Sequence, residues 1–296
     1  MRGFLVAATI ATIHTPSLPG EQTEFPVIDA RGARVVWSDY RAGAWHLMDR
    51  SGAVAVAPRA RPFDVDLGPD GHGGTVAVYS RHGRLYQYSF RTGRETALGV
   101  RGRWPAVWGS RIAFVRGGRL YWRAHGRSHR LPVPRVRGRS LISELDMRDR
   151  TVVFTWHAVG QFDTYSFIYR ATTGGSLQAL SRGAYFAGGD ASSLKSIGQP
   201  ALGPAGVDWL YEDAEHTDYR AAFMRAHGTR TSTRSTAVAF AHAGRTAYWI
   251  DAGARGQAQP GGAFPLLADD TLTYRSTPRS YLQIRRCGIR RPCRPL

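Results

Sequence analysis

The sequence predicts an all-β chain folded as a β-propeller of six four-stranded blades, and three observations lead to that expectation. Gly (34 residues) and Pro (16 residues) recur along the whole chain, which suits many short strands joined by tight turns. The apolar runs are short, and they alternate with polar residues as strands do rather than helices. These runs also recur with a period near 40 residues, which is typical of one propeller blade.

Each repeat has the same internal order. A short apolar strand leads through a turn with Gly, Asp or Pro to a second strand rich in β-branched and aromatic residues, and two weaker strands follow. The six second strands are expected to begin near residues 35, 76, 112, 152, 207 and 247. One such sheet cannot bury both faces alone, whereas sheets packed around an axis bury them all and leave only short edges. The wider step before residue 207 predicts an insertion near residues 186–197.

The domain organisation follows from this repeat. We expect a single propeller domain over residues 21–284, preceded by a separate segment, residues 1–20, and followed by a basic tail, residues 285–296. The segments 272–274 and 281–284 would either complete the sixth blade or begin a partial seventh. The protein is expected to be a monomer.

The N-terminal segment allows two interpretations. Arg2 precedes an apolar stretch from Gly3 to Ile13, whose length fits the apolar region of a secretory signal. Cleavage after Ser17, or retention as an anchor, would then place the propeller outside the cytoplasm, secreted or in the periplasm or cell envelope. Alternatively, Leu5–Ile10 forms a strand that pairs with the last blade and closes the ring. No run of about 18 apolar residues occurs, so no other membrane-spanning helix is expected.

The two cysteines, Cys287 and Cys293, lie close together near the C-terminus. In an exported protein we expect a disulfide between them that fixes the tail. Two thiols alone do not make a structural zinc site.

The formal net charge of +18 would suit a binder of polyanions. The basic residues, however, are 39 Arg against the single Lys195, and the chain contains no Asn. Since Lys and Asn share AT-rich codons, this composition indicates a GC-rich coding sequence, and part of the Arg excess reflects mutational bias. The Arg residues are also scattered, so no specific nucleic-acid binding is expected. Non-specific polyanion binding, weakening as salt rises, remains a second alternative.

One turn carries a resemblance to a known family. Leu67 to Gly71 reads Leu-Gly-Pro-Asp-Gly and precedes the apolar strand Val76–Tyr79, which resembles the Ser-Pro-Asp-Gly turn of TolB-like, WD40-like propeller repeats. Leu202 to Gly206 is a decayed copy with Ala205 in place of the Asp. The resemblance implies a propeller that serves as a binding platform in an envelope or periplasmic setting. In that family the motif is a structural turn and carries no active site.

Two acids precede this turn, Asp64 and Asp66. Their spacing superficially suggests a calcium loop, but the fifth, sixth and twelfth positions are Gly68, Pro69 and Thr75, so no EF-hand is expected. On the inner strand of a blade, either acid would be placed to face the central channel.

A second acidic group gives the strongest site candidate in the sequence. Its members are Glu212, Asp213, Glu215, His216 and Asp218. Acids and a histidine in a loop between strands would supply general acid and base groups or an oxygen-rich cation site. The alternative is a solvated hairpin without a function of its own.

The tryptophans divide into two groups. Most recur at or near the second strands and are expected to pack between blades; these are Trp37, Trp108, Trp156, Trp209 and Trp249. Trp104 lies outside that register, and we expect it to be an exposed contact residue for a ligand.

No catalytic signature accompanies these residues. The chain has no G-x-S-x-G elbow, no P-loop and no dinucleotide fingerprint, and it lacks the Asp-box of sialidase-like propellers. We therefore expect no enzyme, cofactor or metal, but an exported propeller that binds a protein, a peptide or an envelope glycan. The alternative is a glycan-acting hydrolase or lyase with carboxylates in the central channel, which requires two carboxyl groups converging in one pocket.

Overall fold

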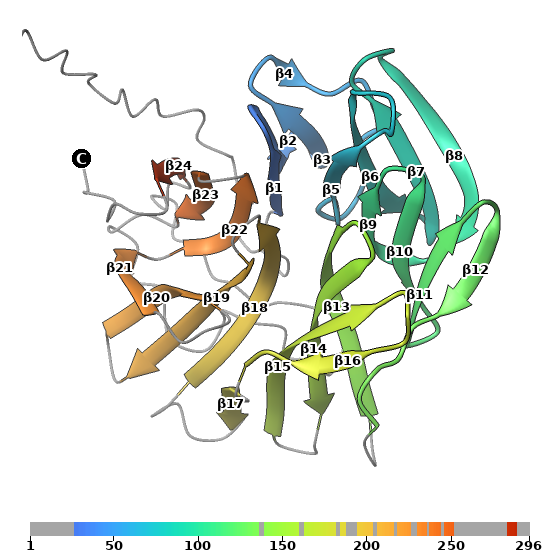
Figure 1. Cartoon of the computed structure of the whole chain (residues 1–296). Coiled ribbons are helices and arrows are strands. Elements are labelled where there is room, and N and C mark those ends of the chain that lie inside the picture. The colour runs from blue at the N-terminus through green and yellow to red at the C-terminus, as the bar shows by residue number, and fades with distance from the viewer. Residues whose placement is uncertain are drawn as a thin grey trace, which may run out of the picture.

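The computed structural model describes residues 27–135, 139–159, 163–181, 184–187, 194–203, 206–215, 218–225, 230–235, 237–243, 246–251 and 283–288. These residues form strands, turns and loops, and the strands make six antiparallel sheets set around a central axis (Figure 1). The all-β propeller predicted from the repeat is confirmed. The described ranges contain no helix that is long and apolar enough to cross a membrane.

The first three sheets, which we call blades 1 to 3, are four-stranded meanders. Blade 1 contains β1 (Ile28–Arg31), β2 (Arg34–Arg41), β3 (Ala44–Asp49) and β4 (Gly52–Ala53). Blade 2 contains β5 (Asp66–Pro69), β6 (Thr75–Arg81), β7 (Arg84–Ser89) and β8 (Arg94–Arg101). Blade 3 contains β9 (Arg103–Trp108), β10 (Arg111–Arg116), β11 (Arg119–Ala124) and β12 (Arg127–Arg130).

Blades 4 to 6 follow the same order with local changes. Blade 4 contains β13 (Arg139–Arg148), β14 (Thr151–Val159), β15 (Asp163–Thr172) and β16 (Leu177–Ala179), and β17 (Ala184–Ala187) also pairs with β15. Blade 5 contains β18 (Leu194–Gly203), β19 (Gly206–Glu215), β20 (Asp218–Arg225) and β21 (Arg230–Ser235). The described strands of blade 6 are β22 (Ala237–Ala243), β23 (Thr246–Asp251) and β24 (Gln283–Gly288).

The innermost strands close a ring. Each of β1, β5, β9, β13, β18 and β22 contacts the next, and β22 contacts β1 (Figure 1). The six predicted second strands are found as β2, β6, β10, β14, β19 and β23. The proposed ring-closing strand Leu5–Ile10 and the segment 272–274 lie outside the described residues. The domain limits remain predictions, and β24 crosses position 285, where the tail was expected to begin.

The hydrophobic core lies between neighbouring blades because successive residues of a strand face opposite sides of its sheet. On β6, Tyr79 packs toward blade 1 while Val78 packs toward blade 3. On β14, Phe154 packs toward blade 3 while Val153 packs toward blade 5. Each second strand therefore needs apolar residues at nearly every position, which explains why these strands dominate the sequence pattern.

Candidate functional site at the mouth of the central channel

Three inner-strand aspartates join successive blades around the channel. Asp29 on β1, Asp66 on β5 and Asp146 on β13 each accept a hydrogen bond from the inner strand of the following blade. The donors are, in the same order, the backbone N–H groups of Leu67, Val107 and Leu202. Asp29 accepts a second bond from the N–H of Ala30, at 2.7 Å. These carboxyl groups are therefore already engaged as acceptors by the backbone.

A second acid lies two residues before the aspartate in blades 2 and 4. The N–H of Trp104 donates to Asp64 Oδ2 at 2.9 Å, and the N–H of Gln199 donates to Glu144 Oε2 at 2.8 Å. Both donors have a positive φ, +50° for Trp104 and +51° for Gln199. The same bridge therefore occurs between blades 2 and 3 and between blades 4 and 5.

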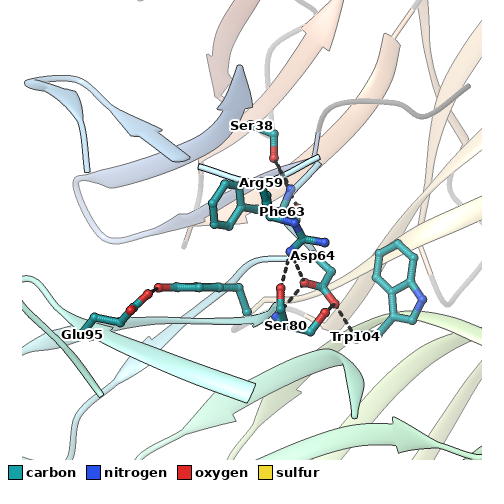
Figure 2. Close-up of polar contacts among 8 residues, drawn as sticks. Ser38, Arg59, Phe63, Asp64, Ser80, Glu95 and Trp104 are labelled. Carbon is teal, nitrogen blue, oxygen red and sulfur yellow. Dashed lines mark hydrogen bonds and ion pairs between the residues drawn. The ribbon is translucent and has the colours of Figure 1, made fainter. Parts of the chain in front are cut away.

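Asp64 is fully occupied by structural partners, which Figure 2 shows together with Trp104. Besides Trp104, its carboxylate accepts from the N–H and the hydroxyl of Ser80, at 2.8 and 2.6 Å, and pairs with Arg59 at 3.3 Å. Trp104, expected as an exposed contact residue, is half-buried and packs against the core between blades 3 and 4. Neither residue lines the cavity described next.

Burial changes the ionisation of the inner aspartates. It raises the pKa of Asp29 and of Asp66 well above the usual range, and the charge of Asp146 adds to both shifts. Burial raises the pKa of Asp146 to about 6, although its backbone hydrogen bonds and the charges of Arg31 and Arg148 act in the opposite direction. Asp66 is buried, accepts the N–H of Val107 and is not among the residues that line the cavity described next, so its expected orientation toward the channel stays a prediction.

A cavity of about 890 Å³ opens at the end of the channel where the inner strands turn into the second strands. Its lining includes Asp29, Arg31, Trp108, Asp146, Arg148 and Leu202. The guanidinium carbon of Arg31 lies 4.4 Å from the centroid of the Trp108 ring, and that of Arg148 lies 5.5 Å from it. We call these three residues, Arg31, Trp108 and Arg148, the mouth cluster. It combines an aromatic face with two cations, a pairing that is favourable in itself.

The backbone places the predicted acidic group at one end of blade 5. Glu212, Asp213 and Glu215 lie on β19, and Asp218 begins β20. In the backbone register of β19 with β20, Glu215 lies opposite Asp218. Both are at the end of blade 5 that is remote from the β18–β19 turn. His216 and the side chains of the four acids lie outside the described part of the chain. The expected role of this group as an acid–base or cation site therefore stays a prediction.

Sequence reasoning missed four of the residues at the mouth, although the sequence contains a signal for them. Asp29-Ala-Arg31 and Asp146-Met-Arg148 are two copies of Asp-x-Arg, each immediately before the first turn of a repeat. Aligning the repeats on that turn would have shown the match. Trp108 occupies the corresponding last position of β9 in blade 3, so it contributes to the cavity as well as to packing between blades.

A buried histidine in blade 4 is the other polar group of note. His157 Nε2 lies 3.1 Å from the Ser143 hydroxyl, and its Nδ1 lies 2.8 Å from the Ser166 hydroxyl. Burial lowers the pKa of His157 to about 4, so the ring is neutral at pH 7. None of the three residues lines the channel cavity. The contacts join β13, β14 and β15, which is a structural role.

Within the described ranges, no group of three or more His, Cys, Asp or Glu side chains is arranged to hold a metal ion. Cys287 lies on β24, whereas Cys293 is outside the described residues, so the disulfide remains a prediction.

Comparisons with known proteins find distant structural likenesses and no matching sequence family. No protein-family model and no curated protein sequence matches the chain. Among solved structures, it is similar to the tricorn protease at 10% identity and a TM-score of 0.43, covering 81% of this chain but only 28% of that one. It is similar to the N-terminal domain of Nup159 at 10% identity and a TM-score of 0.36, over 87% and 75% of the two chains. It is also similar to the AtxE2 isopeptidase in its apo form, at 9% identity and a TM-score of 0.30, over 79% of this chain and 48% of that one. Likenesses this distant do not transfer a function.

Proposed function

We propose that this protein is a non-catalytic binding module that takes a peptide segment of a partner protein at the mouth of its central channel. The observation that carries the proposal is the mouth cluster, in which Trp108 and two arginines line a cavity of about 890 Å³. Ligand sites of folded proteins are commonly concave and combine aromatic surface with a few polar groups that fix orientation. An aromatic side chain flanked by arginine also has the composition of an interface hot spot.

The arrangement of the acids supports binding over catalysis. A general acid must release its proton to a substrate within hydrogen-bond reach. Both carboxylate oxygens of Asp29 instead accept backbone N–H groups, and Asp146 accepts that of Leu202. These bonds hold the blades together and leave the arginines and Trp108 as the groups available to a ligand.

The test is a screen of the purified chain against an immobilised random hexapeptide library. We expect enriched peptides whose affinity falls by at least about tenfold in Trp108→Ala, because the aromatic anchor is removed. The matched control is Trp122→Ala, since Trp122 is a half-buried tryptophan of the same blade that stacks on His129 away from the cavity. Enrichment of no peptide, or equal binding by the wild type and Trp108→Ala, would refute the proposal.

A glycan-acting hydrolase is the second candidate, and one observation favours it. Asp29 and Asp146 line the same cavity, and burial raises the pKa of Asp146 to about 6, a suitable value for a general acid. Incubation with a panel of neutral and acidic polysaccharides, followed by a reducing-end assay, tests this. Activity that disappears in both Asp29→Asn and Asp146→Asn would replace the binding proposal with hydrolysis.

The setting of the protein belongs to the same proposal. We propose that it is an exported, monomeric relative of the TolB-like propellers, on the strength of the apolar stretch from Gly3 to Ile13, the Leu67–Gly71 turn and the cysteine pair. Mass spectrometry of the protein purified from its native cell would test export. Recovery of an intact Met1 from the cytoplasm with both thiols free would contradict it.

A further inference from the structure

The two arginines of the mouth cluster occupy equivalent positions in blades that face each other across the ring. Arg31 is the last residue of β1, and Arg148 is the last residue of β13. In a ring of six blades, blades 1 and 4 are opposite, so the two side chains approach the channel axis from opposite sides. Both reach the ring of Trp108, which ends β9 between them. The cluster therefore places two positive charges around one point of the mouth.

Neither guanidinium group has an ion pair or a hydrogen bond with any part of the chain that the structure describes. Arginines near them differ in this respect, since Arg34 pairs with Asp49 at 2.9 Å and Arg111 pairs with Asp149 at 3.1 Å. Contact with an aromatic face uses the plane of a guanidinium group and leaves the N–H groups at its edge available. Arg31 and Arg148 thus present unused donors beside a cavity.

We infer that the mouth cluster selects peptides by a carboxylate, which Arg31 and Arg148 bind from two sides above the ring of Trp108. This inference rests on the proposed function and adds the chemical class of the ligand. Guanidinium and carboxylate groups match in geometry and form strong charge-assisted pairs. The carboxylate is supplied by an Asp or Glu side chain or by the C-terminus of the peptide.

The charge of the lining favours a carboxylate over a phosphate. The cavity is also lined by Asp29, Asp49 and Asp146 and by Arg34 and Arg50, and Arg34 pairs with Asp49. Any negative charge on Asp29 and Asp146, which lie two residues before Arg31 and Arg148, opposes an incoming anion. A dianionic phosphate would meet about twice the repulsion that a carboxylate meets. The site therefore suits a single negative charge.

The experiment measures the dissociation constants of peptides from the library in matched pairs. One arm replaces Glu by Gln or Asp by Asn within the peptide, a second amidates the C-terminus, and a third replaces the acid by phosphoserine. For the wild-type chain we expect one of the first two changes to weaken binding by at least about tenfold, and the phosphoserine peptide to bind no better than the acidic one. Arg31→Gln and Arg148→Gln should each remove most of the preference for the carboxylate peptide over its amide counterpart.

Two controls keep the outcome interpretable. Arg127→Gln makes the same change of net charge on the outer strand β12 and should leave the preference intact. If a Gln variant does not fold, the salt dependence of the wild type serves instead: the preference should shrink between roughly 0.05 M and roughly 0.5 M salt, because screening weakens charge pairs.

The results separate the two proposals. Peptides that need Trp108 but bind equally with and without their carboxylates would overturn the inference and leave the binding function standing. Preferred binding of phosphoserine peptides would also overturn it. Failure of every peptide to bind would refute the binding function itself.

Discussion

At the residue scale, the inner aspartates are acceptors for backbone groups of the next blade rather than simple surface charges. Asp146 shows the consequence most clearly, because its burial raises the pKa to about 6 while the N–H of Leu202 donates to its Oδ2. A buried carboxylate is expensive to ionise, whereas a buried N–H group without an acceptor is also unfavourable. The acceptor function and the charge can therefore be separated by substitution.

We predict that Asp146→Asn and Asp146→Ala change stability in opposite directions at pH 7. Asn keeps an acceptor and removes the buried charge, so the free energy of unfolding should rise by about 1 to 3 kcal/mol. Ala leaves the N–H of Leu202 unpaired, and the free energy should fall by about 1 to 3 kcal/mol. Urea unfolding of the three proteins checks this. Equal destabilisation by both substitutions would mean that the charge itself stabilises the fold.

The same carboxyl group has a defined pH window. Its folded-state pKa of about 6 exceeds the ordinary aspartate value of 3.8, so the folded state binds the proton more tightly. The wild type should therefore lose stability relative to Asp146→Asn as pH rises from about 4 to about 6, and the difference should level off above that range.

His157 is predicted to give a pH dependence of stability with the opposite sign to that of Asp146. Its folded-state pKa of about 4 lies below the ordinary histidine value of 6.5, so the unfolded state binds the proton more tightly. The wild type should lose up to about 3 kcal/mol relative to His157→Gln as pH falls from about 6.5 to about 4. Urea unfolding at several pH values measures this difference. A difference that does not change with pH would show that the ring is not held in the neutral form.

At the scale of elements, the close approach of β5 and β9 sets the distance between blades 2 and 3. A Cβ atom on Gly68 would lie 2.2 Å from the carbonyl oxygen and 2.6 Å from Cγ1 of Val107. We predict that Gly68→Ala lowers the free energy of unfolding by at least about 2 kcal/mol, because the backbone of β9 must move.

Gly174 is the matched control for that substitution. It lies in the turn between β15 and β16, and a Cβ atom there would meet only the Thr172 hydroxyl, at 3.7 Å. Gly174→Ala should change stability by less than about 0.5 kcal/mol in the same urea titration. Similar values for the two variants would mean that the spacing of blades 2 and 3 adapts without loss.

The strands were more predictable than the site, for a physical reason. A second strand such as β6 is buried on both faces, so its apolar run is visible within a few residues. The channel mouth draws single residues from β1, β9 and β13, and only ring closure brings them together. The Asp-x-Arg copies at 29–31 and 146–148 were present in the sequence, but their meaning depends on knowing that both precede a turn at the channel.

The acidic group around Glu212 and Asp213 illustrates the opposite case. Its residues are adjacent in the sequence and were therefore easy to select, but β19 and β20 carry them to the end of blade 5 opposite the β18–β19 turn. Density of charge along the chain selected these residues, whereas position within the repeat marks the residues of the mouth.

At the scale of the whole molecule, the inner strands form a ring in which β22 contacts β1, so the mouth has a fixed outline made by several blades (Figure 1). Hydrogen bonds that Asp29, Asp66 and Asp146 accept from backbone N–H groups join three of the successive blade pairs next to the mouth cluster. Bonds of this kind limit the conformational entropy that the rim loses when a ligand binds. The fold thus favours recognition by a preformed site.

The most direct test of this account is hydrogen–deuterium exchange of the chain with and without the tightest peptide from the library. The account predicts slower exchange at the turns of the mouth, residues 31–34, 108–111 and 148–151, and no change at the opposite turns, residues 41–44, 81–84 and 116–119. Slower exchange only at the opposite turns, or only along the outer strands β8 and β12, would contradict it and place the binding surface elsewhere on the propeller.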